Sequence, residues 1–329
     1  MPKLSISSLA PDELERIRAF APDRFGSVMP GTRAQVESSW MAEIAELFQE
    51  ETTLALTAER DATVCGFALC TPTPWESRLL EQSMWAVKYL AVDPKVAEVD
   101  LVAASLVAEV TRQLSRRGAN FVLCKAEAAE PVLIKALETD GFLRTDTLLD
   151  FVCDCQKVRA QNAALRVPEG FTLRLAVATD LEPLAETARA AFAQHFGRFH
   201  ADPRIGQTAA TRVYEEWIRS CAQGWADWVY VAMNGERVAG YSAWKKPSPI
   251  EARHGLRLGH YSIGAVHPVF AGRGLFETLT RAGMAQLCGS TDWIEGPTHI
   301  ENRAVQHVYR RLGWEEVGAH HSFHRWLTN

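Results

Sequence analysis

The sequence predicts an α/β fold of the α+β kind, in which a mixed sheet is covered by helices and the arrangement occurs twice along the chain. Two observations predict it. Segments with strand periodicity alternate with amphipathic helical segments in each half, and the halves match at an offset of about 174 residues. A length of 329 residues also fits two domains better than one.

Two pairs of short motifs carry the repeat. Val92-Asp-Pro94 corresponds to Val266-His-Pro268. Further along, 137–142 corresponds to 309–314 after a slip of two residues. Each match is short, but their order and their nearly constant offset indicate two copies of one series of elements.

Local patterns define the elements of the second half. Alternation over 171–177 is typical of a strand, Thr179 is the expected N-cap of the next helix, and Asn234-Gly235 between two apolar runs predicts a hairpin. The expected strands are 171–177, 228–233, 238–245, 256–266, 293–298 and two that end at Trp326. The expected helices are 180–192, 208–222, 274–287 and 302–312.

The first half repeats this series, from a strand at 3–7 to a strand at 148–155. Between the halves, 156–170 is short and polar and contains Pro168 and Gly170, which favours a linker. We therefore expect a first domain over 1–155, a linker over 156–170 and a second domain over 171–329.

Composition is that of an ordinary globular protein, with 47% apolar and 23% charged residues. No apolar run approaches the ~20 residues that a membrane helix needs, and the first residues lack the apolar core of a signal peptide. Seven scattered cysteines match no disulfide or zinc framework. We expect reduced thiols in a cytoplasmic protein without a membrane partner.

Charge is distributed unevenly. The net charge of −5 argues against a nucleic-acid binder. Residues 1–166 carry a net −6 and 167–329 a net +1, and all ten histidines lie in the second half, so an anionic ligand is expected there. His320-His321-Ser-Phe-His324 lacks the helical spacing of a metal site and is interpreted as a strand, and we expect no metal.

The most informative segment covers 262–276. An apolar strand leads to Pro268, a Gly272-Arg273-Gly274 loop follows, and an amphipathic helix begins. Backbone amides and a helix N-terminus converge at such a loop, which suits a pyrophosphate. The glycines let phosphates approach the backbone, and Arg273 adds positive charge. With Tyr309 as a possible proton donor, the pattern suggests an enzyme that holds a phosphate-bearing carrier and moves a group from it.

These residues resemble the GCN5-related N-acetyltransferase (GNAT) superfamily, whose pattern is Val-x-Pro, two residues, then Arg/Gln-x-x-Gly-x-Gly/Ala. The chain has Val266-His-Pro268 and then Ala271-Gly272-Arg273-Gly274-Leu275-Phe276. Ala271 replaces Arg or Gln, and Phe276 replaces a small residue. Asn302-Arg-Ala-Val-Gln-His-Val-Tyr309-Arg-Arg-Leu-Gly313-Trp314 is similar to the superfamily's Asn-x-x-Ala…Tyr-x-x-x-Gly-Phe. The resemblance covers nearly the whole chain as a tandem pair and is sharp only in the second half.

The resemblance implies that acetyl-CoA, or another acyl-CoA, binds the second half. It implies that Asn302 hydrogen-bonds near the pantetheine and that Tyr309 protonates the leaving sulfur. From the residues alone, Asn302 is also a good N-cap and Tyr309 also a residue packed on the sheet, and these alternatives stay open. The resemblance places the pantetheine arm along Gly264, Ala265 and Val266, and the pyrophosphate on the amides of Ala271, Gly272, Arg273, Gly274, Leu275 and Phe276.

Acyl transfer to nitrogen also needs a neutral amine. Glu295, on the strand after the glycine-loop helix, is the candidate base, with an exposed strand carboxylate as the alternative. His195, or the pair His200 and Asp202, are further candidates for the base, and transfer without a base is also open. We expect His200 and Asp202 to contact the substrate, although the pair more simply shapes a loop. Trp217 offers an aromatic face for a sugar or nucleobase, or packs in the core.

The first half is expected to be degenerate and to bind no acyl-CoA. Alignment through Pro94 and Pro268 places Glu98-Val99-Asp100 opposite the glycine loop, and carboxylates there would repel a pyrophosphate. The slip of two residues places Leu137 opposite Tyr309 and Glu130 opposite Asn302.

A narrower and less specific resemblance concerns Phe199-His-Ala-Asp-Pro-Arg204 and the C-terminal strand, which are similar to acetyltransferases of the TDP-fucosamine type. Those enzymes acetylate the amine of a nucleotide-linked amino sugar. The leading hypothesis is an N-acyltransferase that moves an acetyl or short acyl group from acyl-CoA to a primary amine of a small molecule, possibly such a sugar. The alternatives are a peptide, polyamine or aminoglycoside acceptor, or a non-catalytic acyl-CoA-binding protein. The sequence leaves the acceptor and the oligomeric state open.

Overall fold

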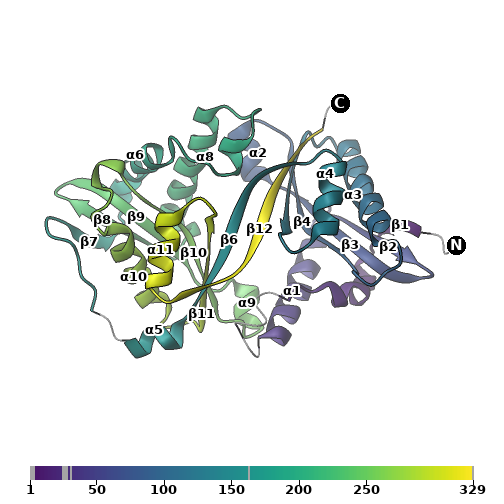
Figure 1. Ribbon diagram of the computed structural model, residues 1–329, viewed down its shortest axis with the longest axis horizontal. Coiled ribbons are helices and arrows are strands. Elements are labelled where there is room, and N and C mark those ends of the chain that lie inside the picture. The colour runs from purple at the N-terminus through teal and green to yellow at the C-terminus, as the bar shows by residue number, and fades with distance from the viewer. Residues whose placement is uncertain (1–3, 24–28, 30–31, 162–163, 328–329) are drawn as a thin grey trace. The chain divides into compact units, whose positions relative to one another are not determined.

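The computed structural model describes residues 4–23, 29, 32–161 and 164–327. Contacts divide the chain into two compact units. The first unit comprises Met1–Thr147 together with Ala319–Asn329, and the second comprises Leu148–Gly318. Each has the expected α/β composition, with helices packed on a mixed sheet, so the predicted fold class is confirmed (Figure 1).

The first unit has the strand order β1-β2-β3-β4-β5-β12-β6. Strands β4 and β5 are parallel and the preceding neighbours are antiparallel, which makes the sheet mixed. The strands are β1 (Leu4–Ser8), β2 (Leu54–Arg60), β3 (Thr63–Pro72), β4 (Met84–Val92), β5 (Phe121–Glu127), the end of β12 (Trp314–Trp326) and the start of β6 (Leu143–Asp154). The helices are η1 (Pro11–Phe20), α1 (Arg33–Leu47), α2 (Pro74–Leu80), α3 (Val99–Arg116) and α4 (Pro131–Thr139).

The second unit also has a mixed sheet, with the strand order β6-β11-β10-β9-β8-β7. Only β10 and β11 are parallel among its registered pairs. Its further strands are β7 (Thr172–Leu175), β8 (Trp228–Asn234), β9 (Arg237–Lys245), β10 (Leu258–Val266) and β11 (Trp293–His299). Its helices are α5 (Cys155–Gln161), η2 (Ala178–Asp180), α6 (Leu181–Phe192), α7 (Arg198–Ala201), α8 (Gln207–Ser220), η3 (Cys221–Trp225), α9 (Pro249–Arg253), η4 (Pro268–Phe270), α10 (Leu275–Leu287) and α11 (Arg303–Arg311).

Two strands take part in both units. Strand β6 starts in the first unit, and its residues 148–154 pair with β11 of the second. Strand β12 starts in the second unit, and its residues 320–326 pair with β5 of the first. The units therefore differ from the expected domains at the end of each half, because each half gives its last strand to the sheet of the other.

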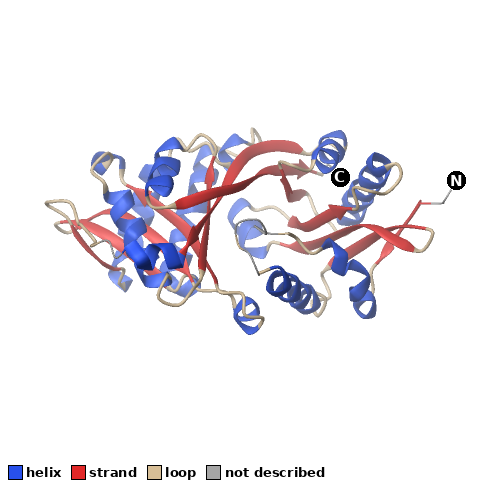
Figure 2. Cartoon of the chain, turned by 60° about the horizontal axis from the view of Figure 1, so that its bottom comes forward, coloured by secondary structure: helices blue, strands red, loops and turns tan. Residues whose placement is uncertain are grey.

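Two apolar layers hold the second unit together. On one face, Leu184 of α6 and Ile218 of α8 pack against Tyr241 and Ile263 of the sheet. On the other face, Leu279 of α10 belongs to a separate cluster with β8 and β9. Figure 2 shows helices on both sides of these strands. Alternating side chains point to opposite faces of a strand, so each apolar set needs its own helical cover.

Several local predictions are confirmed and others are wrong. The hairpin at Asn234-Gly235 is confirmed, since Gly235 has φ +60° between β8 and β9. Thr179 is not the N-cap of α6. Asp180 holds that position, and its carboxylate accepts hydrogen bonds from Arg174 and the Val177 amide. The two expected C-terminal strands are one long strand, β12.

The expected linker over 156–170 is partly helical. Helix α5 occupies its first residues, and Arg159 donates a hydrogen bond of 3.2 Å to the carbonyl of Thr291. Residues 162–163 of the linker, Lys3 of the first expected strand, and the last two residues of the second expected domain lie outside the described residues. All seven cysteines are buried free thiols. Among the described helices, none combines the length and the apolar character needed to cross a membrane.

Candidate functional site

The glycine loop joins β10 to α10 and leaves its backbone open. Gly272 and Gly274 have φ of +75° and +79°, which is the left-handed region that residues with a Cβ rarely adopt. Apart from its chain neighbours, no described atom lies within 4 Å of a Cβ built on Gly272, and for Gly274 only a Pro168 carbon lies as near as 4.0 Å. Ala271 and Arg273 are also exposed. The loop at the start of a 13-residue helix is therefore not filled by side chains.

Two guanidinium groups lie at the rim of this loop. Arg273 is 6.0 Å and Arg237 is 5.5 Å from the centre of the Phe270 ring, measured from the guanidinium carbon. Arg237 also lies 3.0 Å from Nε2 of His267, and the pKa of this histidine is lowered by burial and by the arginine charge. Arg237 was not predicted from the sequence, because it approaches Phe270 and His267 from the hairpin strand β9.

Strands β10 and β11 separate in front of the loop. Within the part of the chain that the structure describes, their parallel ladder covers Leu258 to His260 and stops. Residues Gly264, Ala265 and Val266 pair with β9 on one side only. The register with β9 shifts around Ser262, which is a β-bulge. One edge of β10 is thus available for an additional extended segment.

Tyr309 lies beside this gap in the sheet. Its side chain is fully buried and stacks on Trp314, with ring centres 4.5 Å apart. Its hydroxyl has no hydrogen-bond partner among the described residues, and burial raises its pKa well above the usual range. A Cβ built on Gly296 of β11 would lie 3.2 Å from this hydroxyl. A buried hydroxyl without a partner costs about 1–3 kcal/mol, so this hydroxyl does not stabilise the fold.

A second tyrosine shares this environment. Tyr261 of β10 lies 6.1 Å from Tyr309 between ring centres, and its hydroxyl is also buried without a partner in the described part of the chain. A Cβ on Gly264 would come within 2.0 Å of that hydroxyl, so glycine is required there. The Phe276 ring lies 6.3 Å from Tyr309. Tyr261 was missed, because no motif marks it.

Asn302 and Leu275 have clear structural roles. The Asn302 side chain accepts a hydrogen bond of 3.3 Å from the Val305 amide and caps α11, which confirms the N-cap alternative. Leu275 is 1% exposed and packs in the cluster beneath α10, so its amide is the group that the loop presents. The proposed contacts of Asn302 with pantetheine stay a prediction.

The candidate base Glu295 lies on the face of the sheet opposite Tyr309. Side chains alternate along β11, so Glu295 and His299 point away from the Tyr309 side, where Gly296 lies. Glu295 Oε1 lies 2.8 Å from Nδ1 of His260. The His299 ring centre is 4.4 Å from that of Phe196, which follows α6. The sequence identified Glu295 but not His260, whose partner is set by strand register.

Aromatic residues of α6 and α8 cover the same face. Trp217 donates a hydrogen bond of 3.2 Å from its indole nitrogen to Ser262, the bulge residue. Next to it Tyr214 stacks on Phe192, with ring centres 4.3 Å apart, and His195 lies 5.1 Å from Tyr214. These rings form an aromatic wall near the point where the strands part. Trp217 therefore both packs in the core and lies close to the gap.

His200 and Asp202 lie deeper than expected. His200 is 8% exposed, bonds to Thr211 through Nε2 at 3.1 Å, and has a pKa lowered by burial. Asp202 is 1% exposed and accepts a hydrogen bond from the Arg204 amide. These contacts agree with the alternative that the pair shapes a loop. Their part in binding a substrate stays a prediction.

The first unit has a matching but differently filled region. Its parallel ladder between β4 and β5 stops at Val87 and Cys124, as in the second unit. The residue before α3 is Glu98, with φ +56°, whereas the residue before α10 is Gly274. The expected alignment is therefore wrong by two residues at this point: the first loop is shorter, and Asp100 lies in the first turn of α3.

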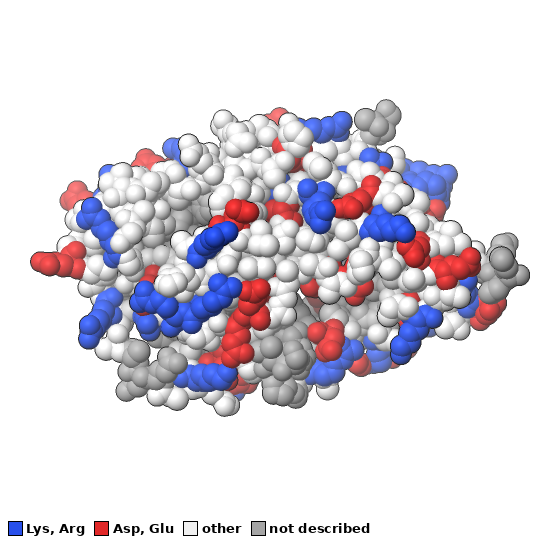
Figure 3. Space-filling view, viewed as in Figure 1, with Lys and Arg blue, Asp and Glu red and all other residues white. Residues whose placement is uncertain are grey.

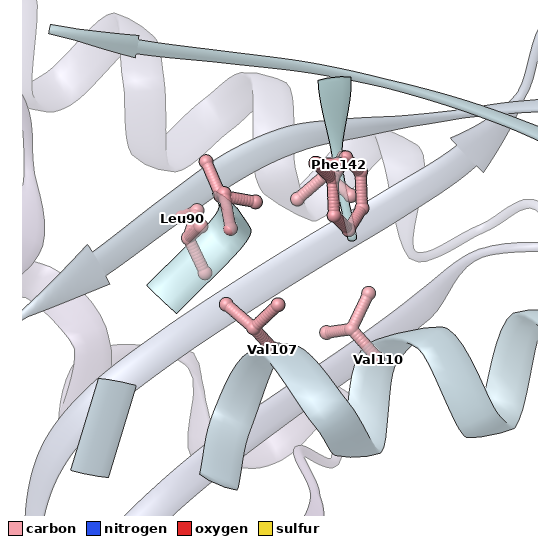
Figure 4. A pocket seen from close by; sticks show the side chains of 6 residues that line it. Leu90, Val107, Val110 and Phe142 are labelled. Carbon is pink, nitrogen blue, oxygen red and sulfur yellow. The ribbon is translucent and has the colours of Figure 1, made fainter. Parts of the chain in front are cut away.

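Side chains close the region where the first unit would need a gap. Glu98 pairs with Arg60 at 2.8 Å, so its carboxylate is held beside the helix start. Glu130 occupies the N-cap position of α4, as Asn302 does in α11, which confirms that alignment, but only the Asn302 side chain makes a capping hydrogen bond. Figure 4 shows the apolar lining near α3, where no room for a water molecule remains. The lining residues are Val87, Leu90, Val107, Val110, Leu137 and Phe142.

Charges over α10 and α11 are largely paired. On the face in Figure 3, basic and acidic side chains are interspersed over these helices. Arg281 and Arg311 both lie about 3 Å from Glu277, and Arg310 lies 2.6 Å from Glu316. This surface has no single strong charge, so an anion would be attracted by the loop amides and its rim rather than by the helix surface.

No family model matches the chain. A mycothiol acetyltransferase from Nocardioides is 30% identical over 164 residues, which cover 46% of this chain and 52% of that protein. The spore coat polysaccharide biosynthesis protein SpsD of Bacillus subtilis is 23% identical over 266 residues, covering 79% of this chain and 84% of that protein. The alignment thus spans about half the length of the first relative and most of the second.

A solved structure matches the whole chain. It is described as a tandem GNAT protein from the clavulanic acid biosynthesis pathway, and the match covers 99% of both chains with a TM-score of 0.60 and 15% sequence identity. At this identity the similarity establishes the fold, including its two-unit organisation.

Proposed function

Because the chain has the fold of a tandem GNAT protein, we propose that it is an acyl-CoA-dependent N-acyltransferase that modifies a primary amine of a small molecule. The observation that supports this most is the combination of the open Gly272–Gly274 loop with the unpaired edge of β10 beside Tyr309. The loop amides suit a pyrophosphate, the strand edge suits an extended arm, and the hydroxyl suits a leaving group that needs a proton.

The residues present fit acetyl-CoA. The amides from Ala271 to Phe276 would hold the pyrophosphate, with Arg273 and Arg237 at the rim. The edge of Gly264 to Val266 would pair with the pantetheine amides. Bound acetyl-CoA supplies a thioester, whose acyl group passes to the amine. The first unit would bind none, because Glu98 replaces the second glycine and apolar side chains close the gap.

Tyr309 would donate a proton to the departing sulfur. Burial keeps the phenol protonated across the physiological pH range, since its pKa lies well above the usual value. On the other face, Glu295 would accept a proton from the acceptor. Glu295 and Tyr309 lie on opposite sides of the gap. This arrangement suits a reaction in which the amine approaches from the side of Glu295 and the thiol leaves on the side of Tyr309.

The aromatic wall supports a ring-shaped acceptor such as an amino sugar. Trp217, Tyr214 and His195 provide flat surfaces near Glu295's face of the sheet. The names of two relatives, one a mycothiol acetyltransferase and one a polysaccharide biosynthesis protein, also favour a small polar acceptor over a peptide. A nucleotide-linked amino sugar is our leading candidate.

Release of free thiol from acetyl-CoA, measured with a panel of amines, tests the proposal. The panel contains a nucleotide-linked amino sugar, a polyamine, an aminoglycoside and a lysine peptide. We expect amine-dependent thiol release that is fastest with the sugar. Release with another amine alone would reject the sugar and keep the enzyme. Binding of acetyl-CoA without release for any amine would reject the enzyme in favour of a binding protein.

A further inference from the structure

A hydrogen-bonded triad lies where β10 and β11 part. His260 is held between two carboxylates, with Nδ1 2.8 Å from Oε1 of Glu295 and Nε2 3.2 Å from Oε2 of Glu251. The side chains are largely buried, with exposed fractions of 24% for His260, 15% for Glu251 and 14% for Glu295. Because ionised carboxylates only accept hydrogen bonds, both ring nitrogens must donate, so His260 is an imidazolium.

The start of α9 fixes the outer member of the triad. Glu251 Oε2 accepts a hydrogen bond of 2.7 Å from the Ser248 amide, and the Glu251 amide donates one of 3.2 Å to the Ser248 hydroxyl. This capping box sets the position of Glu251. Glu251 in turn orients the ring of His260, and His260 orients Glu295. The fixed geometry at the start of α9 therefore also fixes the side chain of Glu295 on β11.

The triad carries one net negative charge, from two carboxylates and one imidazolium. Burial disfavours charge on His260, but the two carboxylates outweigh it and raise its pKa to about 9. Lys245 of β9 lies opposite His260 with its ammonium 3.7 Å from the Trp225 ring centre, and apolar Val152 of β6 lies opposite Glu295. Past the other side of the triad, α9 ends with Arg253 and His254.

We propose that Glu251 and His260 are positioning residues that hold Glu295 in place to bind the acceptor as an ammonium ion and to remove its proton. This rests on the proposed function. One N–H bond of the ammonium breaks and one O–H bond forms on Glu295, which leaves a neutral amine with a free electron pair. The carboxylic acid then returns its proton to water, so no charge accumulates.

Each member has a separate part. The imidazolium fixes one oxygen of Glu295 and favours its ionised form. Glu251 offsets the charge of the imidazolium, so the triad stays anionic and attracts a cation. Without Glu251, the imidazolium of His260 would either cancel the charge of Glu295, leaving no net charge to attract a cation, or lose its own proton. This requirement explains why a histidine that contacts one carboxylate is held by a second.

The kinetic test compares His260→Gln and Glu251→Gln with wild type, using thiol release and a protonated amine. We expect kcat/KM for the amine to fall about 10- to 100-fold in each, as for other groups that orient a reacting residue, with acetyl-CoA affinity unchanged by calorimetry. A positive charge beside a carboxylate favours its ionised form, and His260→Gln removes that charge, so we expect the acidic limb of the pH profile to move to higher pH in this variant. Lys245→Gln removes a neighbouring positive charge that does not hydrogen-bond Glu295, so it should move the profile less than His260→Gln does.

An NMR titration of the His260 ring tests the geometry without turnover. We expect titration near pH 9 in wild type and at a lower pH in Glu251→Gln. The outcomes separate the two proposals: a wild-type protein without thiol release overturns the proposed function and this inference with it. Turnover in wild type together with an unchanged pH profile in His260→Gln, or titration of His260 near 6.5, overturns this inference alone.

Discussion

In both units a residue with left-handed backbone conformation precedes a helix, but it is a glycine in the second unit and a glutamate in the first. In the second unit Gly274, with φ +79°, starts α10 beside an open loop. In the first unit Glu98, with φ +56°, starts α3 and pairs with Arg60. Both units also part their parallel strands after a few residues. Both units thus share one backbone frame, and they differ in the residues at the helix start and in the gap, which under our proposal determine whether a pyrophosphate can bind.

Gly274→Glu gives the second unit the residue of the first and should have the largest effect. A carboxylate facing a pyrophosphate costs several kcal/mol, so we expect acetyl-CoA affinity to fall by about 1,000-fold, or ~4 kcal/mol. Isothermal titration calorimetry measures this. Gly118→Glu is the matched control, because Gly118 has φ +78° and open surroundings in the first unit. Equal losses in both variants would assign the effect to backbone strain.

Leu137→Ala tests the filled gap of the first unit. Leu137 is 1% exposed and lies seven residues after Glu130, the N-cap of α4, as Tyr309 lies seven residues after Asn302, the N-cap of α11. Removing a buried leucine side chain should lower the free energy of unfolding by about 3 kcal/mol, measured by denaturant titration. Acetyl-CoA affinity of the folded protein should not change. A loss of affinity without a loss of stability would give this unit a direct role in binding.

Tyr309→Phe removes the hydroxyl assigned to proton donation. We expect kcat to fall about 100-fold, which corresponds to ~2.7 kcal/mol, with stability unchanged or slightly higher because a buried hydroxyl without a partner is lost. Tyr241→Phe is the matched control, since Tyr241 is also fully buried with an unpartnered hydroxyl in the described chain, but packs with α6 and α8. Retained turnover in Tyr309→Phe would leave Tyr261 as the better assignment.

Glu98→Gly should have the smallest effect. It relieves a left-handed residue that costs about 1 kcal/mol and loses an ion pair whose arginine is 9% exposed, so the changes oppose each other. We expect the free energy of unfolding to change by less than about 1 kcal/mol. No second acetyl-CoA site should appear in calorimetry, because Leu137 and its neighbours still fill the gap. A second site in this variant would show that the carboxylate alone prevents binding.

The tandem fold and the glycine loop could be predicted from the sequence because their signals are local. Strand periodicity, the Asn234-Gly235 turn and the spacing of Gly272 and Gly274 depend on neighbouring residues, and the structure confirms the elements that they predict. The loop in the first unit was misaligned by two residues, because a length difference inside a loop leaves no periodic signal.

The remaining features could not be predicted from the sequence, because they depend on contacts between residues that are far apart in the chain. The exchange of β6 and β12 between the units depends on which strand edges are free, and a strand's sequence does not encode its partner. The contact between His260 and Glu295 depends on the parallel register of β10 and β11. The contact between His260 and Glu251 depends on the short helix α9, which no sequence pattern predicted. Arg237 and Tyr261 reach the site from the hairpin and from a strand without a motif.

Calorimetric titration of the wild-type protein with acetyl-CoA tests the central claim most directly. We expect one site per chain, which is lost in Gly274→Glu and retained in Glu98→Gly. Two sites per chain, or one site that survives Gly274→Glu, would contradict it.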